Sequence, residues 1–145
     1  MTEITIHKVT SEDDLKRCLH IRTVVFVEEQ NVPVEEEIDG LDPQADHYLL
    51  SVAGQAAATA RVRYPDNVAK IERVAVFKGN RGLNIGKRLM EFIMDDICKK
   101  PAITYMKLGA QVQVIPFYEK LGFVCYGEEF LDAGIRHRWM KRDLA

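Results

Sequence analysis

The stretch that decides the fold reads VAVFKGNRGLNIGK and runs from Val74 to Lys87. It begins as an apolar strand, continues as a polar, glycine-containing turn and ends as the start of a helix. The start of a helix carries unpaired backbone N–H groups and the positive end of the helix dipole, so it can bind a diphosphate. Glycine has no Cβ and lets the backbone approach the phosphate oxygens closely. The stretch therefore predicts a pyrophosphate-binding strand–turn–helix unit.

Two common nucleotide-binding motifs do not fit this turn. A P-loop has four residues between its glycines and then Lys-Ser/Thr, whereas Gly82 and Gly86 enclose three, and Arg88 replaces the hydroxyl residue. A dinucleotide fingerprint needs a parallel βαβ unit, whereas this turn follows strands that we expect to be antiparallel. A glycine-rich turn without a ligand is the remaining alternative.

The elements on either side of the turn define the fold class. Before it, the pattern predicts a strand over 5–9, a helix from a capping box at Ser11 to about Glu29, an acidic loop with at most a short helix over 31–46, and strands over 48–53, 56–64 and 68–77. After it, the pattern predicts a helix over 82–99, a strand over 103–108, a helix over 111–121 and a hairpin over 123–130 and 136–142. In the helix over 111–121, Pro116 is expected in the first turn and Gly122 at the C′ position. This order predicts an α+β fold with one mixed, mostly antiparallel sheet flanked by helices, in a single domain over residues 1–145.

The composition is that of an ordinary globular protein, with 47% hydrophobic and 29% charged residues. A net charge of -2 gives no reason to expect a nucleic-acid partner. We find no apolar run long enough to span a membrane and no secretory signal at Met1 to Glu3. The three cysteines are far apart and the four histidines lack metal-ligand spacing, so we expect reduced thiols, a cytoplasmic location and no metal.

The turn closely resembles that of the GNAT superfamily of acetyl-coenzyme A-dependent N-acetyltransferases. The family signature is a strand followed by Gln/Arg-x-x-Gly-x-Gly/Ala, and Arg81, Asn84 and Gly86 occupy its fixed places. Asn84 departs from the usual glycine, although asparagine tolerates left-handed geometry better than most residues. A second segment, 111–123, resembles the family's C-terminal motif, so the likeness extends over essentially the whole chain.

This resemblance implies acetyl-CoA as the acyl donor, direct transfer to a primary amine, and roles for particular residues. The Val74 amide would face the acyl carbonyl, the Val76 backbone would pair with pantetheine, and Gln111 would contact the pantetheine arm. The implied cofactor-binding residues are Val74, Val76, Arg81, Gly82, Leu83, Asn84, Ile85, Gly86, Lys87 and Gln111. Tyr118 stands where the family has its general acid, and its alternative role is core packing.

The general base is open between three alternatives. Glu72 lies two residues before Val74, so regular strand alternation would put both on one face, where Glu72 could act through water. Glu72 could instead pair with a neighbouring arginine on the sheet, and solvent could take the proton.

The acceptor side is expected at the first helix and the loop after it, with Arg22, Phe26, Glu29 and Glu37 as substrate-binding residues. The acidic loop could attract a polyamine, an amino sugar or a lysine-like amine, or it could be a solvated surface. The acceptor side is also similar to a motif of acyl-homoserine-lactone synthases. The residues that match it in order are Arg22, Phe26, Glu37, Asp39, Asp42 and one of Arg61 or Arg63. Those synthases carry a tryptophan that is absent here between Phe26 and Glu37. An idle acyl-CoA-binding module is a further alternative, and the resemblance makes a homodimer one expected assembly.

Overall fold

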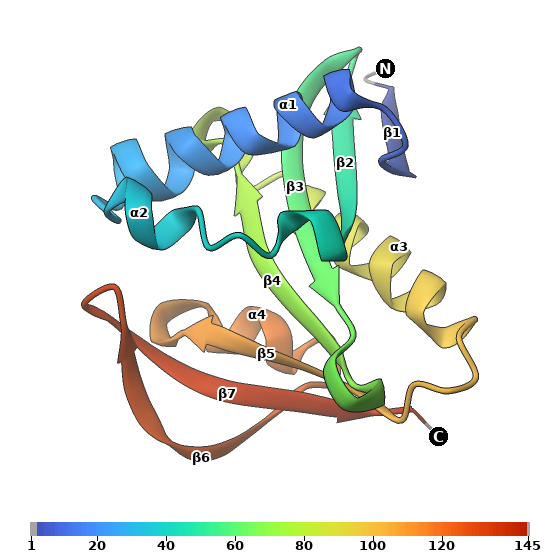
Figure 1. The fold of residues 1–145 in the computed structure, drawn as a ribbon, viewed down its shortest axis with the longest axis vertical. Coiled ribbons are helices and arrows are strands. Elements are labelled where there is room, and N and C mark those ends of the chain that lie inside the picture. The colour runs from blue at the N-terminus through green and yellow to red at the C-terminus, as the bar shows by residue number, and fades with distance from the viewer. Residues whose placement is uncertain (1–2, 145) are drawn as a thin grey trace.

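Seven strands form one sheet in the order β1-β2-β3-β4-β5-β7-β6 in the computed structural model, which describes residues 3–144 (Figure 1). The strands are β1 Ile4–Lys8, β2 Asp46–Val52, β3 Gln55–Arg63, β4 Ala69–Val76, β5 Tyr105–Gln111, β6 Val124–Asp132 and β7 Ile135–Asp143. The helices are α1 Glu12–Arg22, α2 Val34–Glu37, α3 Ile85–Cys98 and α4 Ile115–Glu119. Neighbouring strands are antiparallel except β4 and β5, which are parallel. The predicted α+β class is confirmed, whereas the single-domain prediction also covers Met1, Thr2 and Ala145, which lie outside the described residues.

The helices cover both faces of the sheet (Figure 1). On one face, Cys18, Ile21 and Val25 pack against Leu49 and Ala75. On the other face, the apolar side of α3 joins the larger core, with Leu89, Met90, Ile93 and Ile97 fully buried. No helix within residues 3–144 is both long enough and apolar enough to cross a bilayer.

Two local features confirm expectations from single residues. Pro116 lies in the first turn of α4, where its missing N–H costs nothing. Gly122 adopts a φ of +92° at the C′ position, where its N–H donates to Glu119 and the N–H of Phe123 donates to Tyr118. This pair of bonds is a Schellman motif, and it fixes the end of α4 beside the β4–β5 opening.

The first helix changes pitch at its C-terminal end. Residues 12–22 are α-helical as predicted, but Thr23–Glu29 form a π-helix. Short π-helical segments are rare and are frequently found at functional sites. The change brings Phe26, Glu29 and Gln30 to the carboxyl ends of β4 and β5, where all three line a cavity.

Strands β4 and β5 separate soon after they begin. Their paired residues are Ala69 with Met106 and Lys70 with Lys107. Beyond these pairs, β4 stays with β3 and β5 stays with β7, so the sheet opens between their carboxyl ends. This opening positions the candidate site.

A bulge in β4 corrects the expected orientation of Glu72. Arg61 pairs with Glu72 and Thr59 pairs with Ala75, so two residues, Arg73 and Val74, lie opposite Ala60. Arg73 has a φ of +55°. The extra residue interrupts regular alternation, and Glu72 therefore shares a face with Ala75 and not, as predicted, with Val74.

Candidate active site

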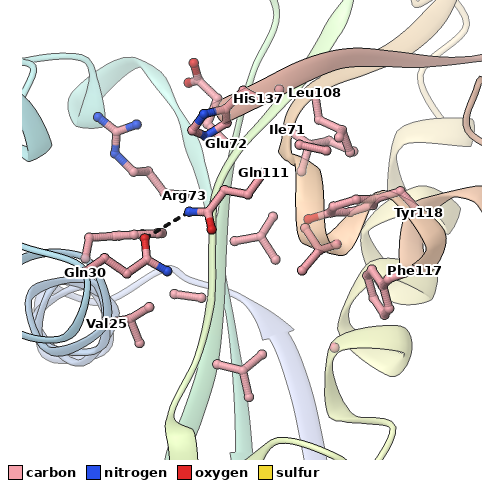
Figure 2. A pocket seen from close by; sticks show the side chains of 18 of the residues that line it. Val25, Gln30, Ile71, Glu72, Arg73, Leu108, Gln111, Phe117, Tyr118 and His137 are labelled. Carbon is pink, nitrogen blue, oxygen red and sulfur yellow. Dashed lines mark hydrogen bonds between the residues drawn. The ribbon is translucent and has the colours of Figure 1, made fainter. Parts of the chain in front are cut away.

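A cavity of about 970 Å³ extends through the opening between β4 and β5 (Figure 2). Its lining comes from the π-helical segment, β4, the turn before α3, β5, α4 and the β6–β7 hairpin. Of the residues predicted from the sequence, it is lined by Val74, Val76, Arg81, Gly82, Asn84, Ile85, Gly86, Lys87, Gln111, Glu72, Tyr118, Phe26, Glu29 and Glu37. Arg22 and Leu83 do not line it, and Leu83 points to solvent with 61% of its surface exposed.

One end of the cavity is the start of α3. Asn84 caps the helix with a φ of +61°, the left-handed geometry expected for this position, and its side chain makes no capping hydrogen bond. The first N–H groups of α3 therefore have neither intrahelical nor side-chain acceptors. Gly86 faces Phe117 closely, since a Cβ would lie 3.4 Å from its Cζ atom. This uncapped, glycine-containing helix start has the chemistry that a diphosphate requires.

Arg81 connects this turn to the π-helical segment. Its guanidinium pairs with both carboxylate oxygens of Glu29, at 2.6 and 3.0 Å, and donates to the Val76 carbonyl at 3.0 Å. The hydrogen bond from Arg81 also lowers the pKa of Glu29. Glu29, which the sequence placed with the acceptor-binding residues, therefore engages the arginine of the phosphate turn.

Tyr118 enters the cavity from α4. Its ring contacts Phe117 and Phe123 edge-to-face, with centroids 5.0 and 6.0 Å apart, and its hydroxyl end points toward the β4–β5 opening (Figure 2). Burial raises the pKa of the phenol above its ordinary value, so the hydroxyl stays protonated at neutral pH. The ring thus packs in the core while its hydroxyl can donate a proton into the cavity.

Gln111 crosses the opening at the end of β5. Its amide nitrogen donates to the Gln30 side-chain oxygen at 2.9 Å (Figure 2). Its own oxygen accepts from Gln113 at 2.7 Å. The Gln111–Gln30 bond joins the end of the π-helical segment to β5.

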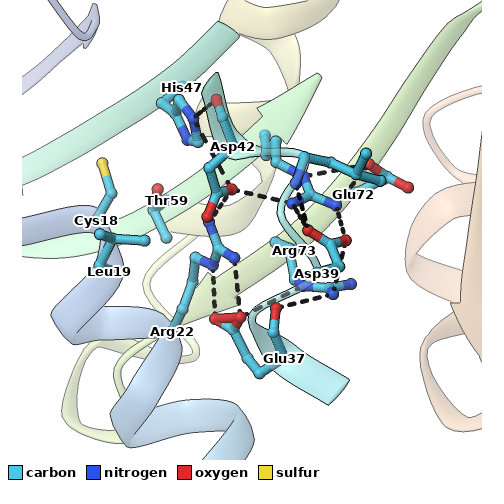
Figure 3. A network of polar contacts seen from close by, with 12 residues as sticks. Cys18, Leu19, Arg22, Glu37, Asp39, Asp42, His47, Thr59, Glu72 and Arg73 are labelled. Atoms are coloured by element: carbon cyan, nitrogen blue, oxygen red, sulfur yellow. Dashed lines mark hydrogen bonds and ion pairs between the residues drawn. The ribbon is translucent and has the colours of Figure 1, made fainter. Parts of the chain in front are cut away.

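Buried ion pairs hold the acidic loop on the acceptor side (Figure 3). The guanidinium of Arg22 pairs with both oxygens of Glu37, at 2.8 and 2.9 Å, and with Asp42 at 2.7 Å. Arg61 pairs with Asp39 and Asp42, at 2.7 and 3.0 Å. Arg22 is 1% exposed and Arg61 is fully buried, so the loop carboxylates mainly neutralise arginines of the fold. The carboxylates of Glu37, Asp39 and Asp42 are therefore held by arginines, whereas Glu35 and Glu36 of the same loop stay exposed to solvent.

Glu72 belongs to the same network. It accepts from Arg61 at 2.8 Å and from Arg63 at 2.7 Å, and Lys70 lies 3.3 Å away. Burial opposes ionisation of Glu72, but the hydrogen bond from Arg63 and the charges of Arg61 and Lys70 outweigh it and lower its pKa to about 2. So acidic a carboxylate is a poor proton acceptor, and these contacts favour the ion-pair alternative for Glu72.

Several lining residues were not identified from the sequence. Lys70 and Arg73 come from β4, Gln30 follows the π-helical segment, and Phe130, His137 and Trp139 come from the C-terminal hairpin. In the sequence, the hairpin residues show only the alternation of a strand. They lie outside the segments 74–87 and 111–123, so nothing in the sequence indicates that they reach the cavity.

Comparison with known proteins agrees with this geometry. A model of the acetyltransferase (GNAT) domain matches residues 14–144. The Bacillus subtilis protein YjcF, named an uncharacterized N-acetyltransferase, is 38% identical over 134 residues, which are 92% of this chain and 95% of YjcF. The crystal structure of an acyl-CoA N-acyltransferase from Pseudomonas aeruginosa superposes with a TM-score of 0.84 at 30% identity, covering 98% of this chain and 99% of that one. Escherichia coli ElaA superposes with a TM-score of 0.85 at 30% identity, covering 99% and 100%.

The opened sheet, the uncapped helix start and these likenesses define the protein as an acyltransferase. The chain belongs to the GNAT acetyltransferase family.

Proposed function

We propose that this protein transfers an acetyl or other short acyl group from coenzyme A to a primary amine by direct transfer. The observation that carries the proposal is one cavity that joins the uncapped start of α3 to the hydroxyl of Tyr118 and continues to the acceptor side. Members of this family use acetyl-CoA or another acyl-CoA, and the residues present here fit that donor.

Backbone groups would hold the donor. The amides from Arg81 to Lys87 would bind the pyrophosphate, because the helix start provides donors and positive potential without a competing side-chain cap. The backbone of Val76 and the side chain of Gln111 would contact the pantetheine arm. On binding, Gln111 would either give up its hydrogen bond to Gln30 to contact the pantetheine arm, or keep that bond so that the two glutamines lie over the arm.

Acetyl-CoA supplies an acyl group held as a thioester, so transfer to an amine makes one carbon–nitrogen bond, breaks one carbon–sulfur bond and moves one proton from nitrogen to sulfur. The bulge at Arg73 releases backbone groups of β4 from regular pairing, and the Val74 amide would donate to the acyl oxygen. Tyr118, kept protonated by burial, would give its proton to sulfur and regain one from solvent. Because Glu72 is held by Arg61 and Arg63, solvent is the favoured acceptor of the amine proton.

Ligand-dependent melting tests donor binding. At 100 times its Kd, acetyl-CoA should raise the free energy of unfolding by about 2.7 kcal/mol, and NAD and ATP should raise it much less. A Gly86→Val variant should lose about tenfold in CoA affinity, because its added methyl groups would crowd Phe117 and the approach of the diphosphate to the helix start. Asn84→Gly is the matched control, since glycine accepts the φ of +61° without strain and should bind as well as the parent or better.

Turnover tests the transfer. A panel of amines with acetyl-CoA, followed by release of free thiol, should reveal at least one acceptor. Equal stabilisation by ATP would contradict the assigned donor site. Stabilisation by acetyl-CoA with no transfer to any amine would instead identify an idle binding module.

A further inference from the structure

Three rings of the C-terminal hairpin form one wall of the cavity, here called the aromatic wall: Phe130, His137 and Trp139. Phe130 stacks on Trp139 with centroids 4.9 Å apart and planes inclined by 23°. It also stacks on His137, at 5.5 Å and 24°. The three ring planes are therefore nearly parallel. His137 and Trp139 pair with Gln111 and Gly109 of β5, so they lie on the sheet face that carries Gln111.

The backbone around the aromatic wall makes room for it. The pairing of β6 with β7 is interrupted between Tyr126 and Phe130, and this irregularity includes Gly127 at a φ of +69°. On β5, Gly109 leaves space for the rings, since a Cβ there would lie 3.3 Å from Cζ of Phe130 and 3.5 Å from Cζ3 of Trp139. A strand interruption and a side-chain-free position on the neighbouring strand thus let Phe130 reach across β7 to β5.

The charges near the aromatic wall restrict which amines fit. The Nζ atoms of Lys70 and Lys107 lie 5.3 and 5.1 Å from the ring of Trp139. Lys70 also pairs with Glu72 at 3.3 Å, whereas Lys107 makes no ion pair within residues 3–144, so a second ammonium group placed on the wall would meet the charge of Lys107. The lining carboxylates Glu37 and Glu72 are already ion-paired with arginines, which leaves Glu36 and Asp132 to attract one ammonium group.

We propose that the acceptor is a monoamine carrying a flat aromatic group that stacks on Phe130 and Trp139, and this rests on the amine-transfer function proposed above. Ring stacking gives the aromatic group an attraction beyond its apolar area. The charge of Lys107 disfavours polyamines and amino sugars with several ammonium groups. Phe130 is thus a specificity-determining residue at the acceptor end.

The test compares 2-phenylethylamine with 2-cyclohexylethylamine, which share one carbon skeleton and one ammonium group and differ in flatness. Trp139 is the chain's one tryptophan, so its fluorescence reports binding at the aromatic wall whether or not turnover follows. With CoA present, the phenyl amine should bind between about twofold and tenfold tighter than the cyclohexyl amine, the range expected for ring stacking. Its kcat/KM should be higher by a similar factor, and spermidine should be the poorest acceptor.

Two variants assign this preference to the aromatic wall. Phe130→Leu removes the ring but keeps an apolar side chain, and it should bring the two amines to about equal affinity. Leu131→Ala changes the neighbouring residue on β6, which is 70% exposed and outside the cavity, and it should keep the parental preference.

Equal or tighter binding of the cyclohexyl amine to the parent would overturn the inference, because a wall that is merely apolar prefers the more apolar ring. So would an unchanged preference in folded Phe130→Leu, or spermidine as the best acceptor. Turnover of amines without the phenyl preference would leave the proposed transfer standing. A phenyl-selective change in Trp139 fluorescence without turnover of any amine would leave the acceptor class standing and reject the transfer.

Discussion

The proposed donor end of the cavity is made mainly of backbone, whereas the proposed acceptor end is made of side chains. At the donor end one continuous stretch, residues 80–87, supplies the turn and the uncapped start of α3. At the acceptor end, Arg22 from α1, the acidic loop, Arg61 from β3 and Glu72 from β4 meet in one ion-pair network (Figure 3). The aromatic wall comes from the far end of the chain. A backbone site can thus be local in sequence, whereas a side-chain site depends on segments brought together by the sheet.

The difference also explains the likeness to acyl-homoserine-lactone synthases. Arg22, Glu37, Asp39 and Asp42 recur in the order of that motif, and the structure joins all four through Arg61 and Arg22 itself. Their shared role in this chain is to hold the acceptor loop against β3 and β4. A pattern of this kind therefore indicates a common scaffold and does not by itself identify a substrate.

Removing Arg22 should have the largest effect on the stability of the acceptor end. Arg22→Ala would remove the bidentate partner of Glu37, which is 5% exposed, and would leave Asp42 paired with Arg61 alone. Losing one partner of a buried ion pair costs about 3–5 kcal/mol of folding free energy. Denaturant unfolding at pH 7 measures the loss.

Arg22→Lys is the milder companion, since it keeps the charge but not the planar fork, and it should destabilise less. CoA affinity at the donor end should stay at the parental value in any variant that folds. A raised KM for the amine with full stability in Arg22→Lys would instead return Arg22 to the substrate-binding residues.

Tyr118 lies between the two ends and tests where the chemistry occurs. Tyr118→Phe keeps the contacts with Phe117 and Phe123 and deletes the hydroxyl. Turnover should fall by roughly 10- to 1000-fold, the range of general-acid effects, while the Kd for CoA stays nearly unchanged. Steady-state kinetics and calorimetric titration measure the two quantities. Parental turnover in the variant would leave Tyr118 with a packing role alone.

Glu72 has the smallest expected effect, and pH separates its two roles. Because its pKa in the folded protein is about 2, against an ordinary value of 4.5, its carboxylate stabilises the fold fully above about pH 4.5, and this stabilisation is lost as the pH falls toward 2. Glu72→Gln should therefore cost about 1–3 kcal/mol at pH 7, and the difference from the parent should shrink below pH 4.5.

The rate profile of this variant gives the second readout. An ion-pair role predicts parallel curves of kcat/KM against pH for the parent and Glu72→Gln. A deficit that disappears at high pH, where more of the amine is already neutral, would identify Glu72 as the base.

The sequence by itself determined the order of the elements and the local backbone of the proposed donor end. Val74 to Lys87 encodes a strand, a left-handed residue at Asn84 and a helix start within one short segment, and such features follow from local backbone preferences. Pro116 and Gly122 likewise fixed the two ends of α4 through their own geometry. Regular alternation, however, gave the wrong face for Glu72, because the bulge at Arg73 depends on how β4 pairs with β3.

Only the tertiary structure decided the acceptor end. Whether a carboxylate such as Glu37 meets solvent, a substrate or an arginine depends on which distant segment lies opposite it. Here the packing of α1 and β3 places Arg22 and Arg61 opposite the loop carboxylates. Phe130 reaches the cavity because β6 loses its register and β5 has a glycine at position 109. These are relations between segments far apart in the chain, and local preferences do not record them.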